Sequence, residues 1–198
     1  MTIQVRVRIC RQQIYTSYKL TIPCTMKYNE LTFGQMEAIV NKLGGMEGVK
    51  GLLSGNMELK VINHIIDCST PPLIPYDGWK VEEHVTGKSF TWDPTKVRLH
   101  LSKNQMDGKT IEGNKLRKEL KDLPVMNANV LDYLLDHPYL IPEEWKGNAV
   151  FFWGTIYRNS GDDLCVRCLI WGGGRWKQHG RWLGDDWVGT IPAIVSAS

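Results

Sequence analysis

The C-terminal part of the sequence consists of three strand-like runs that are separated only by short turn-forming stretches. The runs are AVFFWGTIYR (149–158), LCVRCLIW (164–171) and RWKQHGRWL (175–183), and the connections are NSGDD and GGG. Both connections are turn-forming and short enough to join antiparallel strands as hairpins. The sequence therefore predicts a C-terminal antiparallel β-meander that is rich in aromatic residues.

The segments before the meander predict central helices and further strands. GWKVEEHV (78–85) and TKVRLHLS (95–102) alternate like strands, whereas KTIEGNKLRKEL (109–120) and NANVLDYLLDHP (127–138) have helical apolar spacing. IPEEW (141–145) predicts a short helical turn, because proline suits the first helical position and acidic residues suit the positive end of the helix dipole.

The N-terminal part predicts a small module of its own. Residues 3–22 alternate like a β-hairpin, and MELKVINHII (57–66) alternates like a strand. Between them, Thr32 and Gln35 have capping-box spacing at the start of a helical hairpin that turns at Gly44 and Gly45. A helix-turn-helix DNA reader is disfavoured, because the second helix has few side chains that read bases.

The proline-rich stretch CSTPPLIPYDG is the best candidate for a boundary between modules. We therefore predict an α+β fold that consists of a small α+β module (1–71) and an α+β domain (72–198) with central helices and the meander. One continuous domain is the alternative.

Composition narrows the class of protein. The chain has 198 residues and a formal net charge of +3, which does not by itself indicate binding to polyanions. The apolar runs are too short to span a bilayer, so we expect no membrane partner. An odd number of cysteines without a framework spacing fits a reducing compartment, and we expect a cytoplasmic protein. The cysteines are Cys10, Cys24, Cys68, Cys165 and Cys168.

No catalytic, metal or cofactor site is predicted. CVRC (165–168) has the spacing of half a zinc site, but no second pair of ligands follows, and residues three apart on a strand point to opposite faces. The five histidines lie in separate predicted elements, and none forms a recognised pattern with a nucleophile.

The meander holds the best candidate for a functional surface. If Val150, Phe152 and Ile156 face the core, other side chains of the three runs form mixed faces of aromatic rings and cations. Such faces stack nucleic-acid bases or anchor protein partners, although Trp and Arg also stack on each other across strands for structural reasons. The candidate ligand-binding residues are Trp153, Tyr157, Arg158, Arg167, Trp171, Arg175, Lys177, His179 and Arg181.

Several stretches resemble a group of hypothetical proteins from uncultured bacteria, candidate phyla included. They are LIPEEWKGNAVFFWGTIYRNSGDDLCVRCLIW and WLGDDW, with WDPTKVRLHLSKNQMDGKTIEGNKLRKEL and VMNANVLDYLLDHP before them. The resemblance spans residues 60–198, and LTFGQMEAIVNKLGGMEGVKGLLSG is similar to a segment near the start of such proteins. It implies a bacterial cytoplasmic origin and one co-inherited architecture, and it assigns no activity or site residue.

These observations favour a non-enzymatic binding or accessory protein that uses the aromatic and basic face of the C-terminal sheet. Its ligand is expected to be single-stranded nucleic acid or another protein. One alternative is an enzyme with a pocket between the central helices and the sheet, which uses His100, Asp93 or the polar residues Asn127 and Asn129. A second alternative is a structural protein whose sheet pairs with a copy of itself.

Overall fold

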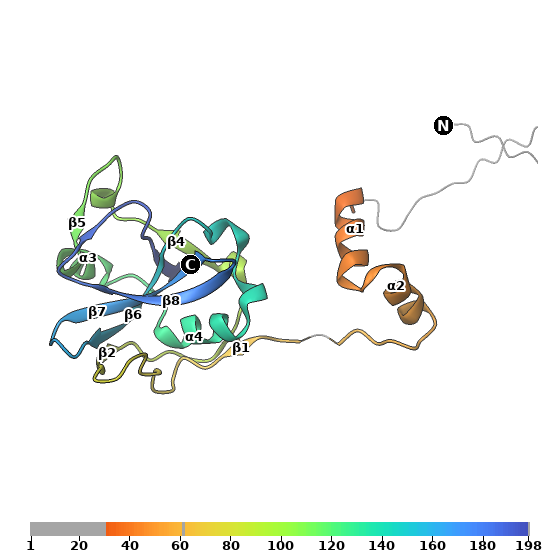
Figure 1. Cartoon of the computed structure of the whole chain (residues 1–198), viewed down its shortest axis with the longest axis horizontal. Helices are drawn as coiled ribbons and strands as arrows, with labels where there is room; N and C mark the ends of the chain where they lie inside the picture. The colour runs from red at the N-terminus through yellow and green to blue at the C-terminus, as the bar shows by residue number, and fades with distance from the viewer. Residues whose placement is uncertain (1–30, 61, 198) are drawn as a thin grey trace, which may run out of the picture. The chain divides into compact units, whose positions relative to one another are not determined.

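The computed structural model describes residues 31–60 and 62–197. By their internal contacts, the described residues divide into two units, 31–60 and 62–197 (Figure 1). The β-hairpin predicted over residues 3–22 lies outside the described residues. Residues 62–71, which the sequence assigned to the N-terminal module, belong to the second unit, because Ile66 and Cys68 are buried in its core.

The described residues of the first unit form the predicted pair of helices, α1 (Phe33–Lys42) and α2 (Gly45–Leu53). The capping box is confirmed: the Thr32 side chain accepts a hydrogen bond from the Gln35 backbone, and the Gln35 side chain accepts one from the Thr32 backbone. Gly44 and Gly45 have φ values of 86° and 77°, which glycine adopts at little cost.

The strand predicted over residues 57–66 is wrong for most of its length. Only Ile65 and Ile66 are in a strand, β1 (Ile65–Ile66), and the other described residues of this segment have no regular structure. Leu59 and Ile62 are 69% and 66% exposed, so their alternation does not reflect a buried face. An alternating pattern predicts a strand only where a neighbouring strand and a core receive it.

The main sheet of the second unit has six strands: β2 (Lys80–His84), β4 (Val97–His100), β6 (Val150–Arg158), β7 (Leu164–Gly172), β8 (Arg175–Trp182) and β10 (Ala193–Ser196). Their order is β4-β10-β6-β7-β8, and β2 also pairs with β6. The predicted meander is confirmed, because β7 pairs antiparallel with both β6 and β8. The chain end was not predicted as a strand, yet β10 pairs parallel with β6 and antiparallel with β4.

Two small two-stranded sheets flank the main sheet. One pairs β1 with β3 (Phe90–Thr91), and the other pairs β5 (Ile111–Glu112) with β9 (Asp186–Trp187). Short 3-10 turns connect the larger elements at Pro94–Lys96, Lys103–Gln105, Pro138–Leu140 and Glu143–Trp145, and the last of these is the predicted turn at 141–145.

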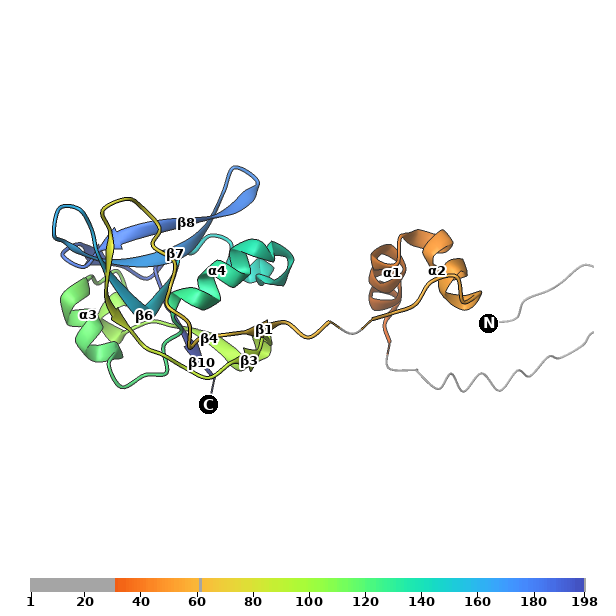
Figure 2. The same cartoon turned by 90° about the horizontal axis from the view of Figure 1, so that it is seen from below.

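The central helices are α3 (Gly113–Leu120) and α4 (Ala128–Asp136). The predicted cap of α4 is confirmed, because the Asn127 side chain accepts a hydrogen bond from the backbone of Asn129. The helix predicted from residue 109 begins only at Gly113, because Ile111 and Glu112 pair with the residues of β9. Both views of the molecule place α3 and α4 on opposite sides of β6 (Figures 1 and 2).

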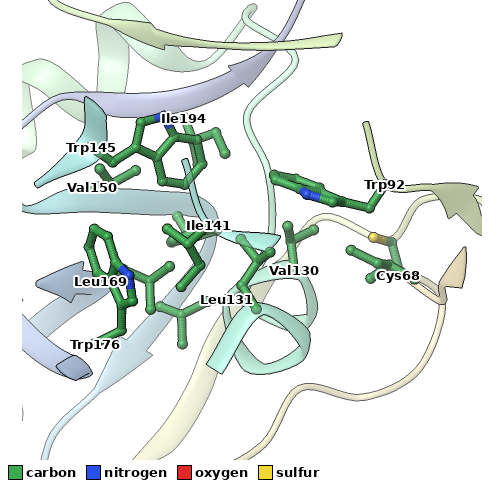
Figure 3. Packing of buried hydrophobic residues seen from close by; sticks show 13 residues of the cluster. Cys68, Trp92, Val130, Leu131, Ile141, Trp145, Val150, Leu169, Trp176 and Ile194 are labelled. Carbon is green, nitrogen blue, oxygen red and sulfur yellow. The ribbon is translucent and has the colours of Figure 1, made fainter. Parts of the chain in front are cut away.

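Two hydrophobic clusters fill the space on the two sides of the sheet. The α4 side includes Val130, Leu131 and Leu134 with Val150 and Phe152, and Figure 3 shows part of this packing. The α3 side includes the side chains Leu116, Leu120, Phe151, Trp153, Ile156 and Val166. β6 is therefore buried on both faces, and the prediction that only one of its faces is core is wrong.

A large irregularity in β6 explains how its side chains are divided between the clusters. Phe151 pairs with Cys168 and Ile156 pairs with Val166, so β6 has extra residues between these points. Gly154 lies within this stretch, and a Cβ atom added there would lie 2.9 Å from the Asn127 backbone before α4. The close approach of two backbones therefore requires glycine at this position.

We expect Gly154→Ala to lower the free energy of unfolding of the second unit by about 2 kcal/mol, because the new methyl group overpacks fixed backbone atoms. Gly172→Ala is the matched control, since an added Cβ there meets nothing within 4 Å. It should change stability by less than about 0.5 kcal/mol. Urea unfolding followed by indole fluorescence reports on the second unit, because all eight tryptophans lie in it. Equal stabilities of the two variants would contradict the proposed contact.

Candidate binding surface

β8 is the edge strand of the main sheet, and its only strand neighbour in the described part of the chain is β7. Figure 2 shows it beyond β7 at the outer side of the sheet. The backbone N–H and C=O groups on its outer side are not used in a strand ladder. Such an edge is a template on which another extended chain can pair.

The basic residues of β8 lie on one face of this strand. Lys177 pairs with Ile170 of β7 and His179 pairs with Cys168, so these side chains project on the α3 side of the sheet. Arg175, Lys177 and His179 are exposed. Arg175 and Lys177 form no ion pair with any described residue. The structure thus places two uncompensated cations and a histidine at successive positions of one face.

The indoles of the hairpin lie on the opposite face. Trp171 pairs with Trp176 across the β7–β8 ladder, and their rings meet edge to face at 5.5 Å between centroids. Trp176 is buried, whereas Trp171 is 38% exposed and Trp182 is 48% exposed. The ammonium nitrogen of Lys146 lies 3.9 Å from the centroid of a Trp171 ring, a cation–π contact that the sequence did not indicate.

The basic residues and the indoles of β8 form two separate rows, so the expected face that mixes rings with these cations is not present. In β8, residues alternate between the basic row and a row that contains Trp176 and Trp182. The rings and the cations of the hairpin therefore project from opposite sides of the sheet, and only a ligand that runs along the edge can contact both.

Three of the predicted ligand-binding residues are interior. Trp153, Tyr157 and Arg167 are 5%, 0% and 1% exposed. Trp153 lies in the α3-side cluster because β6 is covered on that side, and Tyr157 lies on the other face with its hydroxyl donating to the Leu73 carbonyl. They are removed from the candidate surface.

Arg167 is buried as part of a polar network. Its guanidinium donates to both carboxylate oxygens of Asp132 on α4, at 2.5 and 3.1 Å, and it also donates to the side-chain oxygen of Gln178 and the hydroxyl of Tyr157. Burial alone favours the neutral form, but the hydrogen bonds and charge of Asp132 raise the pKa of Arg167 above its ordinary value. Arg167 therefore stays charged, and the network ties β7 and β8 to α4.

Arg158 and Arg181 are exposed in part, but carboxylates and carbonyls already engage them. Arg158 pairs with Glu82 at 2.9 Å and with Asp162 at 3.3 Å. Arg181 lies 3.7 Å from the Asp185 carboxylate and donates to the Asp186 carbonyl. Their charge is partly compensated, so the surface is defined here as Trp171, Arg175, Lys177, His179 and Trp182.

The polar residues considered for catalysis do not converge. Asn127 donates to the carbonyls of Cys68 and Val85, and Asn129 donates to those of Asp67 and Thr70. Asp93 caps a 3-10 turn, where hydrogen bonds from Thr95 lower its pKa. Burial, followed by the charge of Arg98, lowers the pKa of His100. Asn127, Asn129 and Asp93 therefore form hydrogen bonds with the backbone, and His100 does not join them in a common site.

Two histidines from separate elements come together at the end of α4. His64 Nδ1 lies 3.0 Å from the Tyr133 hydroxyl, and the rings of His64 and His137 are 5.5 Å apart. His137 stacks on Tyr133 at 4.3 Å, so the group fastens the segment before β1 to α4. Within residues 31–60 and 62–197, no group of three or more His, Cys, Asp or Glu side chains is placed to hold a metal ion.

Comparisons of the chain with protein-family models, with curated proteins and with solved structures found no match. Among the described helices, none has the length and apolar character needed to cross a bilayer.

The buried ion pair predicts a large effect of one substitution. We expect Asp132→Ala to lower the free energy of unfolding by about 3 kcal/mol, because it leaves the buried Arg167 guanidinium without its counter-charge. Asp136→Ala is the matched control, because Asp136 lies on the same helix, is exposed and has no described ion pair. It should change stability by less than about 0.5 kcal/mol. Similar losses in urea unfolding would show that the network contributes little.

The three described cysteines are buried, and we therefore expect them to be alkylated slowly. Burial raises the pKa of Cys68 and Cys165 to about 11 and that of Cys168 to about 12. Since the thiolate is the reactive form, we expect iodoacetamide at pH 8 to modify these thiols on the order of 100-fold more slowly in the native protein than in urea. Peptide mapping by mass spectrometry measures each site. Rapid native modification of Cys168 would contradict its burial in the sheet.

Proposed function

We propose that the protein is a non-enzymatic binding protein that takes up an extended segment of a partner protein along the free edge of β8. The observation that carries the proposal is the combination of an open strand edge with cations on one face and partly exposed indoles on the other. Of the two ligands expected from the sequence, nucleic acid or protein, this combination supports a protein.

The backbone of β8 supplies the affinity that does not depend on side chains. β8 has eight residues. Its inner edge is fully registered with β7, from the pair Arg175–Gly172 to the pair Trp182–Cys165. A strand held rigidly on one side is well ordered for pairing on the other, and main-chain hydrogen bonds give affinity in this mode of recognition.

The side chains of β8 define which segment fits. An added strand places alternate side chains on opposite faces, next to those of β8. Acidic residues on one face would meet Arg175, Lys177 and His179. Apolar residues on the other face would meet the exposed indole of Trp182. The preferred ligand is therefore an extended segment that alternates acidic and apolar residues.

The same arrangement argues against the other two ligands. A second copy of β8 paired antiparallel in a continuous sheet would bring the two basic rows to the same face, where like charges repel. Single-stranded nucleic acid needs stacking rings and phosphate-binding cations along one groove, whereas the rings and cations of this hairpin lie on opposite faces.

Binding is tested with a labelled ten-residue peptide that alternates Glu and Val, measured by fluorescence anisotropy at low salt. A peptide of the same composition with Glu and Val in separate blocks should bind at least about tenfold more weakly, because it breaks the period-two match. The alternating peptide with methylated amides at every second position keeps its charge but cannot complete the ladder, and we expect it not to bind.

Variants locate the site. Arg175→Gln/Lys177→Gln should weaken binding of the alternating peptide about tenfold, because charge complementarity is lost. Lys103→Gln/Lys109→Gln removes the same charge at exposed positions outside the sheet and should have no effect. Equal binding of the block peptide or the methylated peptide contradicts strand addition. Tighter, steeply salt-dependent binding of oligothymidine would instead assign the edge to nucleic acid.

A further inference from the structure

A second candidate site lies on the α3 side of the sheet, away from β8. A cavity of about 330 Å³ opens between α3, the end of β2 and the middle of β6. Its apolar lining includes Leu120, Trp153 and Ile156, and its polar lining includes Arg117, Lys118 and Lys121. A volume of this size lies within the range of pockets that hold small molecules.

Trp153 belongs to the apolar lining of the cavity, and its side chain is buried. The indole N–H of Trp153 is buried and has no hydrogen-bond partner among the described residues. Buried indoles usually find an acceptor, because an unpaired buried donor is costly. Because this nitrogen is sealed from the cavity, a ligand there would contact the apolar ring of Trp153 and not its N–H.

The polar lining carries excess positive charge. Arg117 is paired with Glu83, which also lines the cavity. Lys118 and Lys121 are exposed and form no ion pair within the described ranges. They lie three residues apart, on one side of the C-terminal end of α3, so their ammonium groups border the same opening.

We infer that this cavity binds a small amphipathic anion, with an apolar body against Trp153 and Ile156 and an acidic oxygen-bearing head between the cavity and Lys118 and Lys121. The shared chemistry is an apolar chain or ring with one acidic head, which a carboxylic acid or a phosphate monoester supplies equally. The inference is independent of strand addition at β8.

A larger cavity elsewhere does not have these features. It measures about 520 Å³ and is lined in part by Cys68, Lys96 and Asn127. The Asn127 amide already donates to two carbonyls, and its oxygen accepts the backbone N–H of Asn129. The buried Asn127 amide in its lining is thus satisfied by the protein itself.

The test titrates the full chain, labelled with ¹⁵N, with octanoate and with octyl phosphate. Acetate lacks the apolar body, and 1-octanol lacks the charge. The Trp153 indole cross-peak is assigned by its loss in Trp153→Phe. We expect both octyl anions to shift this peak saturably, whereas acetate and 1-octanol should bind at least about tenfold more weakly. A difference between the two octyl anions identifies the head group.

Affinities measured by calorimetry then show how much the lysines and the apolar lining each contribute to binding. Lys118→Gln/Lys121→Gln should weaken octanoate binding about fivefold at low salt, whereas the matched Lys103→Gln/Lys109→Gln protein should bind normally. Trp153→Phe should weaken binding about threefold, because the smaller ring offers less apolar contact to the ligand. Since Lys118 and Lys121 are exposed, their replacement leaves the fold intact even where Trp153→Phe does not.

The Arg175→Gln/Lys177→Gln protein distinguishes the two proposals, because it should lose peptide binding and keep octanoate binding. The inference is overturned if millimolar octanoate leaves the Trp153 peak in place, if 1-octanol binds as well as octanoate, or if the lysine variants bind octanoate normally.

Discussion

The burial of β6 on both faces is the constraint on which the rest of the second unit depends. An antiparallel sheet often leaves one face in water, but a strand without a polar face needs cover on both sides. Here α4 and the segments around it cover one side, and α3 with β9 covers the other. The close approach of the α4 cap to Gly154 follows from the same requirement, because a side chain at that point would hold the helix away from the strand.

Covering both faces also decides what happens to polar groups in the meander. Arg167 is on β7, next to the central strand, where no route to solvent remains. It is tolerated because Asp132 and Gln178 supply a counter-charge and acceptors. One strand further out, β8 has only one neighbour, so its cations reach water. In this hairpin, the distance from β6 therefore separates the buried Arg167 from the exposed Arg175 and Lys177.

The sequence predicts those features that depend on local rules. The meander, the capping box at Thr32 and the Asn127 cap all follow from period, spacing and hydrogen-bonding chemistry within a few residues. Features that depend on distant partners could not be predicted. Strict alternation along residues 150–157 failed because the irregularity at Gly154 follows from the position of α4. The pairing of β10 with β6 and of Arg167 with Asp132 joins segments whose proximity no local pattern shows.

The cations and the indoles of β8 lie on opposite faces, and this separation bears both on aggregation and on the choice of a partner. Charged side chains on an edge strand discourage pairing with identical edges, which is how many sheets avoid aggregation. The basic row repels another basic strand, including a second copy of β8, and attracts an acidic one. In the proposed strand addition, the charges that protect the edge also select among partners, because specificity requires an unfavourable term against the wrong ligand. In the same proposal, the indoles on the other face add a second criterion. A partner segment would have to satisfy both in one register, because neighbouring residues of a strand point to opposite sides.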